Sequence, residues 1–161
     1  PEMKASEITA KIIARLGAYD FILAHLATAD MVGHTGNFAA AVRAVETLDE
    51  CVGRLREAVL ARNGVLIVTG DHGNVEQKIH PFSGETVTEH TVNPVPFYLV
   101  GHGYERARQL DRASVLKAKA AVDGILTDVA PTILGLMKLP KPAEMTGKSL
   151  LIALTKSPTP A

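Results

Sequence analysis

The sequence predicts an α/β fold, a three-layer sandwich in which a largely parallel sheet lies between helices. Residues 65–68 are four consecutive aliphatics without helical periodicity, which favours a strand buried on both faces. A long amphipathic helical pattern precedes this run, and a second apolar run at residues 19–26 precedes the helix. Strand, helix and strand in this order form a βαβ unit, which implies a right-handed crossover between parallel neighbours.

The helices are predicted from apolar periodicity and from their end signals. A short helix begins at Ser6 and Glu7 and stops at Gly17. The longest helix covers residues 36–62, with charged residues on one face, and Asn63 and Gly64 end it. Its apolar face, expected to pack on the sheet, consists of Phe38, Val42, Val45, Leu48, Val52, Leu55 and Val59.

The second half of the chain is less regular. Residues 77–95 are polar and lack periodicity, so we expect a long loop, and residues 95–100 form a third strand in which Pro96 favours an edge or the first positions. Residues 104–119 are basic and only weakly patterned. A helix follows Thr127 and Asp128, with Pro131 in its first turn. Residues 1–155 are expected to form one domain segment, and residues 156–161 a frayed tail.

Composition indicates a soluble, cytoplasmic globular protein. Seventeen basic residues balance seventeen acidic ones, so no global field attracts nucleic acid or a membrane surface. Cys51 is the only cysteine, which excludes a disulfide framework, and we expect it to be a small hydrophobe on the long helix. No apolar stretch has membrane-spanning length, and no signal peptide opens the chain. The opening Pro1-Glu2-Met3 leads us to expect a fragment of a longer protein.

Three short motifs carry potential metal ligands beside strand ends. Asp30 and His34 lie four residues apart and would share one face of a helical turn. Asp71 and His72 directly follow the central strand, and His90 lies just before the third strand. The alternatives are that the two aspartates cap helices and that the three histidines are ordinary surface or loop residues.

Taken together, the five groups indicate a metal centre. Carboxylates and imidazoles without cysteine suit one or two divalent ions such as Mn²⁺ or Zn²⁺. Two ions a few ångströms apart form a centre for phosphoryl transfer. Among neighbouring residues, Gly73 and Asn74 permit the left-handed backbone of a tight turn, Thr35 is expected to cap a helix, and Ser83 is expected to be a turn residue.

Five motifs in order resemble the cofactor-independent phosphoglycerate mutases of the alkaline phosphatase superfamily, specifically their C-terminal part. They are A-D-M-V-G-H-T-G, T-G-D-H-G-N-V-E, E-H-T-V-N-P-V-P-F, L-T-D-V-A-P-T-I-L and P-A-E-M-T-G-K-S-L. The resemblance covers nearly the whole chain, from P-E-M-K-A-S-E-I-T onward. His25 and Thr28 stand where the family usually has asparagine, and Gly70 and Val75 where it usually has alanine.

The resemblance implies an alkaline-phosphatase-like sandwich that is incomplete, residues 1–155 being the C-terminal segment of a discontinuous metal-binding phosphatase domain. Asp30, His34 and His90 would hold one Mn²⁺, and Asp71 and His72 would belong to the second of two ions in the intact site. The intact parent would interconvert 3-phosphoglycerate and 2-phosphoglycerate through a phosphoserine intermediate.

The same resemblance implies that the chain alone is inactive. The family's nucleophilic serine lies in an N-terminal segment, and Ser6, Ser83, Ser114, Ser149 and Ser157 lack its context. No catalytic residue is therefore expected in this chain. The parent is expected to be a monomer, whereas the fragment is expected to self-associate through an exposed sheet edge.

Two other functions remain open from the sequence. D-H-G is shared with other enzymes of the superfamily, namely phosphopentomutases, phosphodiesterases and sulfatases. The chain could also be a noncatalytic metal-binding or interaction module that has lost its nucleophile.

Overall fold

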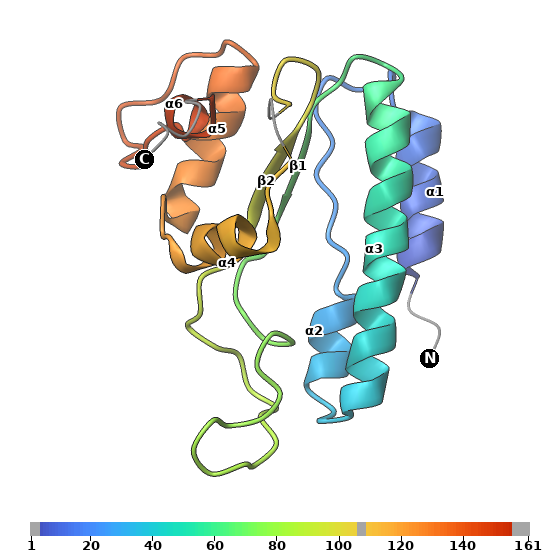
Figure 1. Ribbon diagram of the computed structural model, residues 1–161. Coiled ribbons are helices and arrows are strands. Elements are labelled where there is room, and N and C mark those ends of the chain that lie inside the picture. Colours follow the sequence, from blue (N-terminus) through green and yellow to red (C-terminus); the bar gives the residue numbers. More distant parts are fainter. Residues whose placement is uncertain (1–3, 106–108, 156–161) are drawn as a thin grey trace. The chain divides into compact units, whose positions relative to one another are not determined.

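The computed structural model describes residues 4–105 and 109–155, and the chain divides into two units, Pro1–His102 and Gly103–Ala161. The first unit contains helices α1 (Ala5–Arg15), α2 (Thr28–Gly33) and α3 (Phe38–Leu60) and strands β1 (Leu66–Thr69) and β2 (Phe97–Val100). The second contains α4 (Arg112–Ala120), the short 3₁₀ helix η1 (Leu126–Asp128), α5 (Val129–Leu136) and α6 (Leu151–Thr155). Figure 1 shows these elements along the chain.

Helix α1 lies beside α3, and the predicted end signals of both helices are confirmed (Figure 1). Gly17 follows α1 with φ +91°, and Asn63 follows α3 with φ +55°, the left-handed conformation that these residue types tolerate. The expectation that Thr35 caps a helix is wrong. Asn37 caps α3 instead, because its side-chain oxygen accepts a hydrogen bond from the Ala40 N–H at 3.0 Å.

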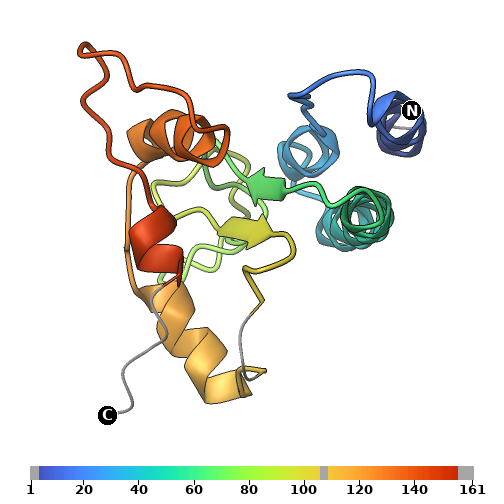
Figure 2. The same cartoon turned by 90° about the horizontal axis from the view of Figure 1, so that it is seen from above.

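The buried face of α3 agrees with the predicted one only in the second half of the helix. The helix packs mainly on α1 and α2, with few contacts to β1, and Figure 2 shows the three helices grouped end-on. Phe38, Val42 and Val45 are exposed, the first by 61%. The buried positions are Ala41, Ala44, Cys51, Leu55 and Val59. The predicted apolar face is thus buried at Leu55 and Val59, whereas in the first half of the helix the alanines occupy the buried positions instead. Small side chains at a helix contact shorten the distance between the helix axes. Cys51 is buried, as expected.

The sheet does not have the predicted parallel arrangement. Within the described residues it contains only β1 and β2, which pair antiparallel with Leu66 opposite Val100 and Thr69 opposite Phe97. Residues 19–26 form no strand, and Phe21 and Leu23 are 50% and 84% exposed. A strand needs a neighbour for its backbone hydrogen bonds, and within the described residues this segment has only an isolated bridge between Leu16 and Tyr19. The predicted βαβ unit and the largely parallel three-layer sandwich are therefore not confirmed, although β2 begins directly after Pro96, as expected.

In the second unit, buried polar groups join α5 to a later segment. The Asp128 carboxylate accepts hydrogen bonds from the backbone N–H groups of Ile125 (3.0 Å) and Lys148 (2.7 Å). The Thr132 hydroxyl donates to the Asp128 carbonyl and accepts from the Leu150 N–H. Pro131 lies in the first turn of α5, as predicted. These bonds hold residues 148–150 against the helix start.

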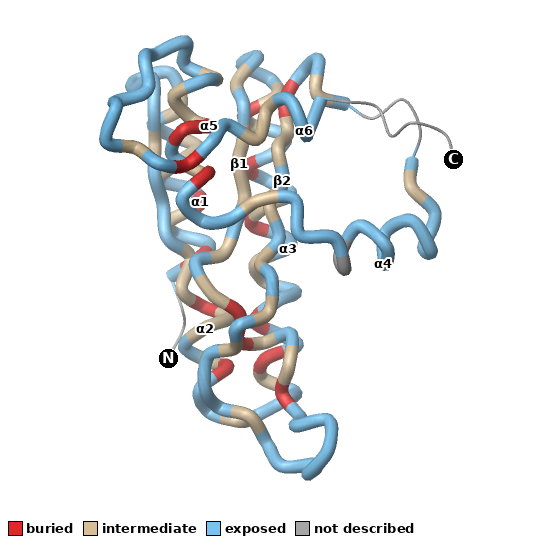
Figure 3. The backbone as a smooth tube through the Cα atoms, turned by 90° about the vertical axis from the view of Figure 1, so that its left-hand side faces the viewer, coloured by how far each residue is buried: buried red, intermediate tan, exposed pale blue. Residues whose placement is uncertain are grey.

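Helix α4 was not predicted, and its described side chains are exposed (Figure 3). Its N-terminus is stabilised by Asp111, whose carboxylate accepts from the Ser114 N–H at 2.8 Å. The tail expected to fray, residues 156–161, lies outside the described residues. No helix in the described part of the chain combines the length and hydropathy needed to cross a bilayer.

Candidate metal centre

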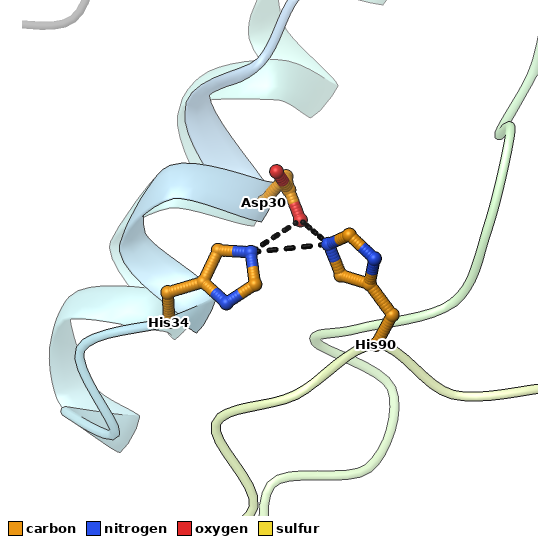
Figure 4. A group of neighbouring side chains, drawn as sticks. All are labelled: Asp30, His34 and His90. Carbon is orange, nitrogen blue, oxygen red and sulfur yellow. Dashed lines mark hydrogen bonds and ion pairs between the residues drawn. The ribbon is translucent and has the colours of Figure 1, made fainter.

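Helix α2 places Asp30 and His34 on one face, as their spacing predicts. The helical backbone continues through His34, whose φ is −66°, so residues four apart project in the same direction. The His34 Nε2 lies 3.3 Å from the Asp30 Oδ1. Figure 4 shows both side chains pointing away from α2 toward a neighbouring loop.

His90 reaches the same point from the long loop between β1 and β2 (Figure 4). Its Nε2 lies 3.2 Å from the Asp30 Oδ1 and 3.1 Å from the His34 Nε2. Ligand atoms about 2.1 Å from one ion are separated by roughly 3.0–3.4 Å in octahedral to tetrahedral geometry. The three atoms therefore have the spacing that one divalent ion requires, and the predicted convergence of these side chains is confirmed.

A backbone contact determines the tautomer of a neutral His34 ring. Its Nδ1 lies 2.7 Å from the Thr88 carbonyl oxygen, which can only accept a hydrogen bond. The proton of a neutral His34 ring is thereby assigned to Nδ1, and the Nε2 lone pair faces Asp30 and His90. This is the form in which an imidazole binds a metal.

Asp30 is ionised in this environment. Partial burial raises the pKa of its carboxyl group, but the hydrogen bond from Asn74 and the positive charge that His34, His72 and His90 carry in their protonated forms outweigh that effect and hold the pKa below its ordinary value. The Asn74 Nδ2 donates to Oδ1 at 2.7 Å. The side chain of Asp30 is 29% exposed, so the anion is open to a cation from solvent.

Glu76 holds the loop that carries His90 in place through hydrogen bonds. Its carboxylate accepts hydrogen bonds from the Thr91 hydroxyl, from the Asn93 Nδ2 at 3.0 Å and from the Asn74 N–H at 2.6 Å. The Thr91 N–H also donates to the Gly73 carbonyl at 2.9 Å. These hydrogen bonds join residues 73–76 to residues 91–93, directly next to His90.

Gly73 has a different role from the predicted one. Neither Gly73 nor Asn74 adopts a positive φ. A side chain at position 73 would instead collide with the Thr91 hydroxyl and the Glu76 carboxylate, so glycine is required for close approach of the loop.

Asp71 and His72 lie next to this group without being part of it. The His72 ring stacks on that of His90, with centroids 3.6 Å apart and an interplanar angle of 19°. The Asp71 Oδ1 is 3.7 Å from the His72 Nε2, and the Asp71 side chain is 74% exposed. No helix begins within residues 70–96, so the alternative in which Asp71 caps a helix is wrong.

Sequence reasoning missed the residues that support the ligands. Asn74 and Glu76 lie within the D-H-G-N-V-E motif and Thr91 within E-H-T-V-N-P-V-P-F, but no supporting role was assigned to them. Lys78 and Thr88 lie outside the five motifs and carry no periodic signal. Their contacts depend on how the loop folds back. Ser83 is a turn residue, as expected, because its hydroxyl donates to the Glu85 carboxylate and accepts from the Glu85 N–H.

Comparison with known proteins supports a metal-dependent role. The family model described as the Metalloenzyme superfamily matches residues 1–141. The 2,3-bisphosphoglycerate-independent phosphoglycerate mutase of Clostridioides difficile is 50% identical over 153 residues, which is 94% of this chain and 28% of that protein. A second such mutase, from Methanosarcina barkeri, is 48% identical over 94% of this chain and 27% of its own length.

A solved structure agrees with these relatives. The crystal structure of Leishmania mexicana phosphoglycerate mutase at low cobalt concentration matches 90% of this chain with a TM-score of 0.69 and 29% identity. The match covers 28% of that chain. The α/β class is thus supported, and this chain spans just over a quarter of the length of the proteins it matches.

Proposed function

Because the chain belongs to the metalloenzyme superfamily, we propose that it is the C-terminal, metal-bearing segment of a cofactor-independent phosphoglycerate mutase. The intact enzyme interconverts 3-phosphoglycerate and 2-phosphoglycerate in glycolysis. Residues 1–155 then contribute one segment of a discontinuous phosphatase domain. The observation that carries the proposal is the triangle formed by the Asp30 Oδ1, the His34 Nε2 and the His90 Nε2.

In this proposal the five predicted residues are shared between two ions. Asp30, His34 and His90 bind one ion, and Asp71 and His72 are the contribution of this chain to a second. Mn²⁺ is the proposed metal, and Zn²⁺ or another divalent ion suits the same oxygen and nitrogen donors. When bound, two such ions would neutralise phosphoryl oxygens and activate an attacking hydroxyl.

The protein's own groups prepare the site for that chemistry. The Thr88 carbonyl keeps the His34 Nε2 lone pair directed at the centre, and Glu76 holds the loop that presents His90. The stack of His72 on His90 brings the two ligand sets side by side. Positioning of charge in this way supplies much of the rate in phosphoryl transfer.

The nucleophile in this proposal belongs to a part of the enzyme outside this chain. The Ser83 hydroxyl is engaged with Glu85, and the Thr35 hydroxyl donates to the Val32 carbonyl at 2.6 Å. The isolated chain should therefore bind an ion and show no conversion of 3-phosphoglycerate with Mn²⁺. Turnover at rates typical of an enzyme would identify a nucleophile within the chain and contradict this assignment.

Metal binding can be tested on the chain alone. Titration with Mn²⁺, followed by electron paramagnetic resonance of the free ion, should show a site that is lost in His34→Ala and in His90→Ala. His25→Ala is the matched control, because His25 is exposed and outside the ligand group. Equal affinity in all three variants would contradict the proposed ligand set.

A chimera tests the mutase function. This chain replaces the matching segment of the Clostridioides difficile mutase, to which it is 50% identical. The chimera should convert 3-phosphoglycerate to 2-phosphoglycerate, and the same chimera with His34→Ala should not. A folded chimera that binds Mn²⁺ but forms no 2-phosphoglycerate would favour the noncatalytic module or another enzyme of the superfamily.

The proposal also covers location and assembly. A glycolytic role is consistent with a cytoplasmic, monomeric parent. Within the described residues, β1 and β2 each have one edge without a strand partner, and such edges favour pairing with another copy of the fragment. Light scattering at increasing concentrations of the isolated chain measures this association.

A further inference from the structure

Lys78 is a buried cation beside the proposed metal centre. It is 5% exposed and is the only lysine or arginine among the buried residues that the structure describes. Its Nζ donates to the Gly33 carbonyl at 3.0 Å and to the Asn74 Oδ1 at 2.6 Å. Neither acceptor is charged, and burial of an ammonium group against neutral acceptors is costly. Such a group needs an explanation beyond packing.

Asn74 connects this lysine to Asp30. Its Oδ1 accepts from Lys78, while its Nδ2 donates to the Asp30 Oδ1 at 2.7 Å. An ammonium group only donates and a carboxylate only accepts, so the Asn74 amide has a single orientation that satisfies both neighbours. Lys78 therefore determines which end of the amide faces Asp30.

The fold also reserves space for the Asn74 side chain. A Cβ atom at Gly33 would lie 2.8 Å from the Asn74 Cγ, closer than carbon atoms approach. Gly33 ends α2, three residues after Asp30, so the amide lies directly against the helix that carries the ligand. Hydrogen bonding and steric fit thus place Asn74 independently of each other.

We propose that Lys78 is a positioning residue for metal binding, acting on Asp30 through Asn74. The Asp30 oxygen that accepts from Asn74 is the same Oδ1 that faces the His34 and His90 Nε2 atoms. Fixing the amide fixes the rotation of this carboxylate before an ion arrives, which lowers the entropy lost on binding. This inference rests on the proposed metal centre.

The test is a double-mutant cycle read by Mn²⁺ affinity. Lys78→Met and Asn74→Ala should each weaken binding about tenfold, the lower end of the range for groups that support a ligand without touching the ion. In the Asn74→Ala background, Lys78→Met should produce no further weakening, because the connection to Asp30 is already absent. Lys11→Met, at an exposed position on α1, is the control and should bind as the unaltered chain does.

A spectroscopic readout separates positioning from a purely structural role. The visible absorption of bound Co²⁺ reports ligand geometry, and it should change in Lys78→Met and in Gly33→Ala, which displaces the amide while leaving Lys78 in place. Folding is checked first by circular dichroism. If Lys78→Met does not fold, Lys78→Leu, which also removes the donor, takes its place.

Two results would overturn the inference. If the unaltered chain binds Mn²⁺ and the folded Lys78 variant binds it equally well with an unchanged Co²⁺ spectrum, Lys78 has only a structural role and the proposed function stands. If the unaltered chain binds neither ion, the metal centre and this inference both fail.

Discussion

Replacement of Glu76 by glutamine tests whether the loop carrying His90 is held by a charged acceptor. One carboxylate oxygen accepts from the Asn74 N–H, and the other accepts from Thr91 and Asn93. Glutamine offers a single oxygen, so its NH₂ group must face at least one of these donors. The variant keeps the shape of the side chain but loses the negative charge. It also loses the hydrogen bonds made by one of the two carboxylate oxygens.

The expected loss of stability follows from these contacts. Hydrogen bonds to charged groups contribute about 1.5–3 kcal/mol each when they are shielded from water. Glu76 is exposed, so water replaces part of what is lost, and we expect a decrease of about 1–2 kcal/mol in the free energy of unfolding at neutral pH.

The pH dependence provides a second signature. Partial burial raises the pKa of Glu76, but hydrogen bonds from Thr91, Asn93 and the backbone outweigh it, so the folded-state pKa lies below its ordinary value. Stability from the ionised form is therefore fully present above the unfolded pKa of about 4.3 and is lost as the pH falls through the folded value. The difference between the unaltered chain and Glu76→Gln should shrink in that acid range.

Urea unfolding followed by circular dichroism, at neutral and at acid pH, measures both effects. Glu46→Gln is the matched control, because Glu46 is exposed on α3 and should give no change. Equal urea midpoints for Glu76→Gln and the unaltered chain at neutral pH, or a difference that persists undiminished in acid, would refute the role assigned to Glu76.

Three further predictions concern packing and hydrogen bonding inside each unit, taken separately. Leu55→Ala, at a position 6% exposed on α3, should lower the free energy of unfolding by about 2–3 kcal/mol in a thermal melt, and an unchanged melt would show that this face is not packed. Gly147→Ala should destabilise the second unit by about 2–3 kcal/mol, because the new Cβ would lie 2.6 Å from the Thr127 carbonyl carbon. Amide hydrogen exchange in α5 measures this loss of stability, and unaltered protection would contradict the predicted clash. Asp128→Asn should weaken the second unit at neutral pH. Backbone hydrogen bonds from Lys148 and Ile125 hold the pKa of Asp128 below its ordinary value, so the stability of the unaltered chain should fall below about pH 4 while that of the variant changes less, as acid titrations of both proteins would reveal.

Elements with local signals were predictable, whereas the sheet was not. Gly17, Asn63 and Pro131 mark helix ends or starts through their own backbone preferences, and these positions agree with the structure. The apolar run at residues 19–26 has strand-like composition, but a strand forms only with a partner strand. In the described residues this run has only an isolated bridge between Leu16 and Tyr19. Periodicity likewise located α3 but could not show which of its apolar residues its neighbours cover.

In the candidate site, the metal ligands were predictable from the sequence, whereas the residues that support them were not. Asp30, His34 and His90 were predicted from ligand chemistry and from their positions beside expected strand ends, and the structure brings their ligand atoms together. Lys78 was not found, because a single lysine in a polar loop usually lies in solvent and only the folded loop shows its burial. Groups that support a ligand depend on tertiary contacts that have no fixed spacing in sequence.

The distance in sequence between Asp30 and His90 makes an ion at this site a cross-link. The two residues are sixty positions apart in sequence, and closing a flexible loop of that length costs about 4 kcal/mol in chain entropy. An unfolded chain would have to meet that cost to bind the ion, whereas the folded chain already holds the two atoms 3.2 Å apart. Mn²⁺ should therefore bind the native state far more tightly than the denatured one and raise the melting temperature with its concentration.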